Sequence, residues 1–316
     1  MKKIRKYIYL LLIFSYVSFT SCEDFALGEK FLQKPPSGDV TIDTIFSTAE
    51  YARRVLWYAY SKLPYGFSTG YNNSTSMRVG SIESLTDLAQ SYVGYAGADK
   101  LYYPGLYNAG SEDESGGEDH ATKYNMYARD PWKGIRHAWV FINNVDRVPD
   151  MTAEEKLRLK AEAKITIAVQ YSEMLRHYGA LPIVDHAIMP EEMGLPERAT
   201  LQQTVDFITR LLDEAIACKE LPWALPEDDL SNESGRMTGA AAMGLKLRVL
   251  LFVASPLFNS DEPYFPGEAS DKLMTWFGGY SEQRWKDAAK AGEDFFKSWK
   301  QGGFYELVQK ETATKN

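Results

Sequence analysis

Six separate segments of this chain carry the spacing of an amphipathic helix, whereas the alternation typical of a strand is scarce. Apolar residues recur at helical intervals in segments that begin near residues 48, 131, 152, 200, 238 and 281. Residues 181–184 form at most a short extended piece. The starts follow no fixed period, so spacing alone predicts no repeat. The pattern predicts an all-α, mostly helical protein in which adjacent helices can pack as antiparallel pairs.

Local signals mark where several helices begin. Asp130 stands before a proline and is expected to be the N-cap of the second helix. Thr152 with Glu155, and Thr200 with Gln203, each have the spacing of a capping box, in which the two side chains satisfy each other's backbone N–H groups. These pairs predict the first turns of the third and fourth helices.

The same spacing predicts which side chains face the core. Gly179 is expected to close the third helix, and Pro182 prevents its continuation. These apolar positions are Ala52, Val55, Leu56, Ala59 and Tyr60 in the first segment and Ile135, Ala138, Trp139, Ile142 and Val145 in the second. They are Leu157, Ala161, Ile165, Ala168 and Leu175 in the third segment and Val205, Ile208, Leu212 and Ile216 in the fourth. In the sixth segment they are Trp285, Ala288, Ala289, Phe295 and Phe296.

The fifth segment, within residues 240–258, is apolar enough to suggest a membrane span. Lys246 and Arg248 near its middle argue against one, since each would cost ~2.5–3.5 kcal/mol at the centre of a bilayer. We therefore expect a helix buried among other helices.

The amino terminus indicates the cellular compartment. Four positive residues precede the apolar run 7–19, which is shorter than the ~20 residues that a membrane span needs, so residues 1–21 are predicted to be a signal peptide. Small residues precede Cys22 in a pattern that resembles a bacterial lipobox, which predicts lipidation at this cysteine. Removal of residues 1–21 takes away four of the 35 positive residues and leaves all 43 acidic ones, a formal charge of −12. Nucleic acid is not an expected partner of so acidic a chain.

Residues 65–129 form a long segment without a helical period, rich in Gly, Ser, Asn and Tyr. A segment of this length in a compact domain is usually functional or disordered. Its acidic stretch 111–119 could bind calcium, but it lacks the ligand order and closing Glu of an EF-hand, so a solvated loop is favoured.

Sequence signals for catalysis are missing. The four histidines, at positions 120, 137, 177 and 186, show no metal-ligand spacing, and no motif for phosphate binding or for a serine nucleophile occurs. We predict no metal, no cofactor and no catalytic residue.

Aromatic residues are more frequent than core packing requires, at 13% of the chain with 20 Tyr and 7 Trp. Sugar rings present apolar C–H faces that stack on aromatic rings, whereas polar side chains bind the hydroxyls. The candidate ligand-binding residues are Tyr71, Tyr92, Tyr95 and Tyr102 in the long segment, and Trp276.

A set of short sequence blocks follows one another along the chain: Cys22-Glu23-Asp24-Phe25, Phe31-Leu32-Gln33-Lys34-Pro35-Pro36, Asp43-Thr44-Ile45-Phe46, Trp132-Lys133-Gly134-Ile135-Arg136, Ala161-Glu162-Ala163-Lys164, Arg176-His177-Tyr178-Gly179-Ala180-Leu181-Pro182, Gly235-Arg236-Met237-Thr238 and Ala254-Ser255-Pro256-Leu257-Phe258-Asn259. In this order the blocks resemble the SusD/RagB family of outer-membrane nutrient-binding lipoproteins. Two positions depart from the family pattern: Ile167 stands where an Arg is usual, and Trp139 where an Asn is usual.

The resemblance implies tetratricopeptide-like helix hairpins that carry long ligand-binding loops. It implies an SusD-like amino-terminal helical domain over residues 22–280, and residues 281–316 as the start of a truncated carboxy-terminal region. Such proteins are lipid-anchored on the outer membrane, where Glu23 and Asp24 resemble a signal for surface display. They bind oligosaccharides, or in some cases peptides, and pass them to a SusC-like TonB-dependent transporter without chemistry.

Three other functions remain open from the residues alone. The same scaffold could take peptides, which the sequence barely distinguishes from glycans. A surface glycosidase would need a pair of carboxylates, and the 43 acidic residues single out none. A helical-repeat adaptor that holds other proteins together would not need the loop aromatics.

Overall fold

The structure is a computed structural model, and it describes residues 41–63, 87–88, 90, 103–105, 130–188, 192, 194 and 196–305. Cys22, the four candidate tyrosines and the acidic stretch 111–119 lie outside the described residues. The chain divides into two compact units, Met1–Thr44 and Ile45–Asn316. The predicted domain boundary at residue 280 stays a prediction.

The regular elements among the described residues are helices, with no named strand. The helices are α3 (Ile42–Ile45), α4 (Ala49–Tyr60), α5 (Asp130–Asn144), α6 (Ala153–Tyr178), α7 (Leu201–Ile216), α8 (Leu230–Glu233), α9 (Gly239–Ala254), α10 (Glu268–Asp271) and α11 (Glu282–Gly302), with short 3₁₀ helices η5 (Val145–Arg147) and η6 (Glu227–Asp229). An isolated antiparallel bridge joins Pro182 to Arg198. The all-α prediction is confirmed, and all six predicted helices are present.

Thr152 and Thr200 are the N-caps of α6 and α7, as predicted. The Thr200 hydroxyl accepts from the Gln203 N–H at 3.2 Å, and the Gln203 side chain accepts from the Thr200 N–H at 2.9 Å, which is the predicted capping box. At α6 only half of the box forms, because the Glu155 carboxylate binds Arg53 of α4 at 2.6 and 2.9 Å instead. Helix α5 begins at Asp130 itself, so this residue is the first of the helix and not its N-cap.

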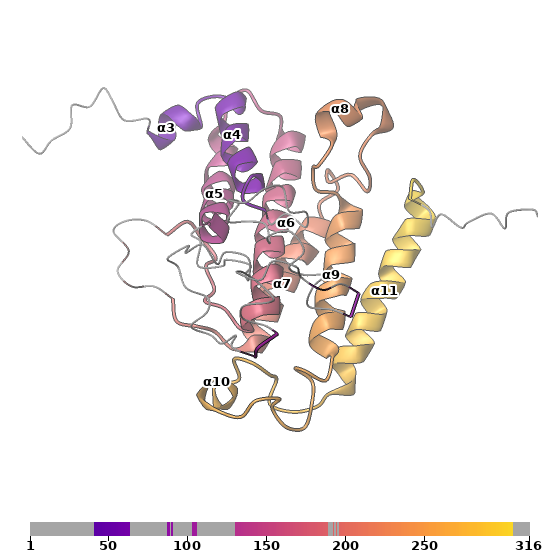
Figure 1. The fold of residues 1–316 in the computed structure, drawn as a ribbon. Helices are drawn as coiled ribbons and strands as arrows, with labels where there is room; N and C mark the ends of the chain where they lie inside the picture. Colours follow the sequence, from indigo (N-terminus) through magenta and orange to yellow (C-terminus); the bar gives the residue numbers. More distant parts are fainter. Residues whose placement is uncertain are drawn as a thin grey trace, which may run out of the picture. The chain divides into compact units, whose positions relative to one another are not determined.

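The long helices pack in chain order as pairs (Figure 1): α4 with α5, α6 with α7, and α9 with α11. Contacts of α5 with α6 and of α7 with α9 join each pair to the next. The side chains between them are almost completely buried, including Leu56, Ile135, Phe141, Ile165 and Ile208. Burial of each such side chain contributes about 1.5–3 kcal/mol, so packing of the apolar faces holds the pairs together.

Most side chains of α4 to α7 that were predicted to face the core are buried, but the prediction for Leu157 is wrong. Its side chain is 47% exposed on the first turns of α6, and Leu159 is buried in its place. Of the apolar positions on α11, Ala288 is buried, whereas Trp285 and Phe296 are 39% and 50% exposed. In the described part of the chain α11 packs chiefly on α9, and one partner cannot cover so wide an apolar arc.

Helix α9 is less enclosed than predicted. It packs on α11, α7 and α6, but the Arg248 side chain is 62% exposed and Leu251 is 51% exposed. The two charged residues in its apolar sequence therefore reach solvent or a partner at the helix surface. None of the described helices combines the length and apolar character needed to cross a membrane.

A cluster of charged side chains, the Glu162 cluster, joins α4, α6, α8 and the segment before α9. Glu162 is completely buried and accepts hydrogen bonds from Tyr60 at 2.7 Å, Arg158 at 3.0 Å and Arg236 at 2.6 Å. Glu233 completes the cluster through contacts with both arginines. Burial, followed by the Glu162 charge, holds the pKa of Tyr60 well above its usual value, so its hydroxyl remains a donor. Each buried charge thus has a partner of opposite sign.

The connection between α9 and α11, residues 255–281, is tied down at both ends. The Asn259 side chain donates to the Ser281 carbonyl at 3.0 Å and accepts from the Ser281 N–H at 2.7 Å. Its middle is fixed to the α6–α7 connection, because the Ala180 N–H donates to the Met274 carbonyl at 2.8 Å. Gly179 allows this approach: it has φ +73°, and a Cβ there would lie 2.8 Å from the Met274 oxygen.

Candidate functional site

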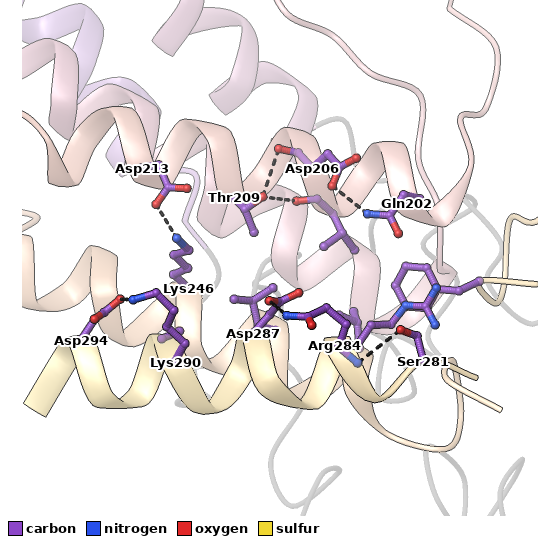
Figure 2. Close-up of a pocket in the computed structure, with 16 residues that line it drawn as sticks. Gln202, Asp206, Thr209, Asp213, Lys246, Ser281, Arg284, Asp287, Lys290 and Asp294 are labelled. Carbon is purple, nitrogen blue, oxygen red and sulfur yellow. Dashed lines mark hydrogen bonds and ion pairs between the residues drawn. The ribbon is translucent and has the colours of Figure 1, made fainter. Parts of the chain in front are cut away.

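A groove of about 460 Å³ runs along α7, α9 and α11 (Figure 2). It forms where the α9–α11 pair meets α7, so three helices supply its walls. The lining residues are Gln202, Val205, Asp206, Thr209, Asp213, Lys246, Leu250, Val253, Phe277, Ser281, Gln283, Arg284, Asp287, Lys290, Ala291 and Asp294.

The groove has a buried apolar side and a solvated polar rim. Val205, Val253 and Ala291 are buried, and Leu250 and Phe277 are partly buried. Carboxylate, amide, hydroxyl and ammonium groups surround them. Such a combination suits a ligand with both apolar faces and hydrogen-bonding groups.

Both lysines of the groove are held by aspartates. Lys246 of α9 binds Asp213 of α7 at 2.6 Å, and Lys290 binds Asp294 one turn along α11 at 2.8 Å (Figure 2). The hydrogen bond from Lys290 lowers the pKa of the Asp294 carboxyl, which therefore stays ionised at neutral pH. These two pairs leave the remaining carboxylates as the acceptors available to a ligand.

Asp206 and Asp287 face the groove from opposite walls, one on α7 and the other on α11 (Figure 2). Each accepts from the amide of a glutamine one turn earlier: Gln202 to Asp206 and Gln283 to Asp287, both at 2.8 Å. The amides orient one oxygen of each carboxylate and leave further lone pairs. The two residues can therefore accept hydrogen bonds from hydroxyl or ammonium groups.

Arg284 closes the groove beside Phe277. Its guanidinium lies 4.0 Å from the centre of the Phe277 ring and donates to the Asn259 side chain at 2.8 Å and the Gly279 carbonyl at 2.9 Å. Burial lowers the pKa of this arginine, which nevertheless stays charged at neutral pH. These contacts fix the aromatic end of the groove to the 255–281 connection.

Trp276, the one predicted ligand residue that the structure describes, lies next to Phe277 and is not among the lining residues. Its indole N–H donates to the Ser270 carbonyl at 2.9 Å, and the ring is partly buried. Its role in ligand binding stays a prediction, as do those of Tyr71, Tyr92, Tyr95 and Tyr102.

Sequence reasoning did not find Asp206, Asp287 or Phe277, although one signal was present. Polar residues recur at intervals of four, three and four along both α7 and α11, which places each set on one helix face. The two sets are Gln202, Asp206, Thr209 and Asp213, and Gln283, Asp287, Lys290 and Asp294. A solvated helix face has the same pattern, so only the packing distinguishes a groove.

Among the described histidines, His186 has the most acidic surroundings. His186 lies between Asp185 and Glu192, 2.8 Å from each, on the exposed α6–α7 connection. Hydrogen bonds to the carboxylates of Glu192 and then of Asp185 raise the pKa of this histidine. Within the described residues no group of three or more His, Cys, Asp or Glu is arranged to hold a metal ion.

Comparison with known proteins gives matches among solved structures. The chain matches no protein-family model and no curated protein. It is similar to a protein named BT4246, with 22% identity and TM-score 0.62 over 83% of this chain. It is also similar to a SusD homologue from Bacteroides thetaiotaomicron, with 17% identity and TM-score 0.56 over 83% of this chain. A SusD-like carbohydrate-binding protein from Bacteroides fragilis matches with 19% identity and TM-score 0.55 over 80% of this chain.

The chain has the SusD-like fold. This confirms the resemblance drawn from the sequence blocks and the prediction of tetratricopeptide-like helix pairs. The chain spans only 41%, 49% and 41% of the three solved chains just described. The match therefore describes less than half of a SusD-like protein.

Proposed function

We propose that this protein is a cell-surface nutrient-binding lipoprotein that captures oligosaccharides and passes them to a SusC-like TonB-dependent transporter. The SusD-like fold supports this proposal, and one of the similar solved structures is that of a SusD-like carbohydrate-binding protein. The lipobox pattern at Cys22 supports a lipid anchor in the outer membrane. Radiolabelled palmitate should label the protein and fail to label the Cys22→Ser variant.

The observation that carries the proposal is the groove along α7, α9 and α11 on this fold. Its apolar side, to which Leu250, Val253 and Phe277 contribute, suits the C–H face of a sugar, and Asp206 and Asp287 offer acceptors for hydroxyl groups from two walls. Neutral glycans match this set best, because a negatively charged sugar would meet the carboxylates of the rim.

Binding without chemistry is part of the proposal. A glycosidase needs a carboxyl whose pKa is raised, so that it is protonated near neutral pH. Every described carboxyl with a clear change in pKa has it lowered: Asp185, Glu214, Glu233, Glu268 and Asp294. We expect the purified protein to release no reducing ends from a polysaccharide that it binds.

Affinity electrophoresis tests the proposal. Native gels would contain soluble starch, laminarin, xyloglucan or galactomannan as neutral polymers and polygalacturonate as an anionic one. We expect retarded migration in at least one neutral gel, and calorimetry then gives the affinity. Failure of the full chain to bind any of these polymers would contradict the proposal.

Peptide capture is the second candidate, because Asp206 and Asp287 could equally accept from an ammonium group. Calorimetry with a tryptic peptide mixture separates the two. Binding of peptides together with absence of binding to every polysaccharide would assign the groove to peptides.

A further inference from the structure

One face of α11 carries an apolar stripe that the described helices leave partly exposed. Its side chains recur at intervals of four, three, four and three residues, which places them along one side of the helix: Trp285, Ala289, Gly292, Phe296 and Trp299. Trp285 and Phe296 are 39% and 50% exposed. Figure 1 shows α11 at the end of the row of long helices, and in the described structure it packs chiefly on α9.

The stripe has a small centre between bulky ends. Gly292 lies against α9, where a Cβ would be 3.6 Å from Leu247, and the neighbouring Ala289 is exposed. At one end the Phe296 ring packs edge-on against Trp299, with the ring centres 5.9 Å apart. The Trp299 indole N–H donates to the Tyr305 carbonyl, which holds this end in place. Small residues at the centre allow the backbone of a second helix to approach closely, while the rings at the ends supply contact area.

The order of residues along the stripe is symmetric. Trp285 and Phe296 lie equally far from its midpoint, and so do Ala289 and Gly292. When two copies of such a helix pack in antiparallel about a two-fold axis at this midpoint, Trp285 of one copy meets Phe296 of the other. Ala289 then meets Gly292 at the centre. A two-fold interface uses the same patch on both subunits, so the patch has to complement itself in this way.

The charges along one edge of the stripe complement themselves in the same arrangement. Glu282, Lys286, Glu293 and Lys297 are exposed along this edge. In the antiparallel pair Glu282 comes opposite Lys297 of the second copy, and Lys286 opposite Glu293. Each match is two residues from exact register, which is about 3 Å along the axis. A parallel pair in register would instead place each charge opposite its own copy.

The alternating signs also argue against a membrane surface as the partner. A helix that lies on a membrane usually has a basic polar face, whereas this edge carries as many acidic as basic residues. Within one copy, Lys286 contacts Glu282 at 3.2 Å, but the two side chains are 59% and 69% exposed. Water screens such a pair, so little is lost when Lys286 turns to the second copy.

We propose that α11 is a self-association surface, on which two copies of this chain pair in antiparallel through the apolar stripe. The inference goes beyond the proposed function and does not depend on glycan binding. Asp287 and Asp294 of the groove lie on the opposite side of α11, so this pairing leaves the groove open. One helix face is a small interface, and we therefore expect monomers and dimers to exchange.

Sedimentation equilibrium of the full-length chain in density-matched detergent tests the association. We expect a monomer–dimer equilibrium for the unaltered protein. Phe296→Ala should weaken association about thirtyfold, because buried aromatic residues dominate the energy of small interfaces. Tyr51→Ala, which removes a 45% exposed ring from α4, is the matched control and should associate like the unaltered protein.

Lys286→Glu and Glu293→Lys test the antiparallel register. Either change places like charges opposite each other at two symmetric positions of the dimer, and we expect each variant alone to associate about tenfold more weakly. An equimolar mixture of the two variants again places opposite charges at both positions. The mixture should associate as tightly as the unaltered protein, which a fault in folding cannot produce.

Four outcomes would contradict the inference. Monomers of the unaltered protein at concentrations up to roughly 1 mM would overturn it. Dimers that survive Phe296→Ala and both charge variants would assign the association to another face. Failure of the mixture to recover would exclude the antiparallel register. Flotation of monomeric Cys22→Ser protein with phosphatidylcholine vesicles, abolished by Phe296→Ala, would assign the stripe to a membrane surface instead.

Discussion

The Glu162 cluster and the groove use the same kinds of residue for opposite purposes. In the cluster, each charge is buried or nearly so and meets a partner of opposite sign: Glu162 is 0% exposed, and the Arg236 and Glu233 side chains are 16% and 13% exposed. In the groove, the ion pairs are open to water, and Asp206 and Asp287 are held only by amides in the described structure. Charged groups whose hydrogen bonds are all made within the protein stabilise the fold. Carboxylates that keep unused lone pairs, such as those of Asp206 and Asp287, can bind a ligand.

The largest effect should follow from Glu162→Gln. Loss of the charge leaves Arg158 and Arg236 buried with one carboxylate between them, which costs about 3–5 kcal/mol when one partner of a buried pair is removed. Urea denaturation followed by circular dichroism gives the free energy of unfolding. A loss below about 1 kcal/mol would show that the cluster stabilises the fold no more than exposed ion pairs do.

Tyr60→Phe tests the cluster by a smaller change. The hydroxyl donates to Glu162 at 2.7 Å and accepts from the Met237 N–H at 3.0 Å, so its removal leaves that N–H without its acceptor. We expect a loss of roughly 2 kcal/mol in the free energy of unfolding. Tyr58→Phe, on the exposed side of α4, is the control and should change stability by less than about 0.5 kcal/mol.

Substitutions in the groove should weaken ligand binding without changing the stability of the fold. Asp206→Asn and Asp287→Asn keep the size of each side chain but remove the charge that strengthens its hydrogen bonds. We expect each to weaken neutral glycan binding about tenfold, with the free energy of unfolding unchanged. Calorimetry and urea denaturation measure both quantities, and Asp228→Asn, outside the groove, is the control. Equal losses of stability and affinity would contradict the distinction between the two regions.

The pH dependence of stability tests the role of Glu233 in the Glu162 cluster. Burial alone would raise the pKa of Glu233, but hydrogen bonds and charges from Arg158 and Arg236 outweigh it and lower that pKa below its ordinary 4.5. The folded state then binds fewer protons than the unfolded state. Stabilisation by Glu233 is present above about pH 4.5 and disappears as the pH falls through the folded-state pKa. As the pH is lowered from 7 to 3, the urea midpoint should fall less steeply in Glu233→Gln than in the unaltered protein.

The smallest effect should follow from Lys246→Ala in the groove. The ion pair with Asp213 spans 2.6 Å, but the two side chains are 27% and 54% exposed, so water screens it. We expect a loss of about 0–1 kcal/mol in the free energy of unfolding, which added salt at roughly 0.5 M should reduce further. A loss as large as that of Glu162→Gln would remove the contrast between buried and open pairs.

The helices themselves could be predicted because their signals are local. Thr200 and Gln203 cap α7 through side chains three residues apart, and Gly179 ends α6 through its own φ. Such contacts involve neighbours in the sequence, so the residue types reveal them. Glu155 shows the limit: it has the position of a capping residue, but Arg53, 102 residues away, takes its carboxylate.

The sequence alone determined that this chain is helical, where most of its helices begin, and which ordered blocks resemble SusD-like proteins. The tertiary structure alone decided that Glu162, Tyr60 and Arg236 form one buried cluster, and that polar faces of α7 and α11 line one groove. The physical reason is the distance along the chain over which each interaction acts. Caps and helical spacing act within a few residues, whereas the partner of a buried charge or the opposite wall of a groove is set by how helices far apart in the chain pack together.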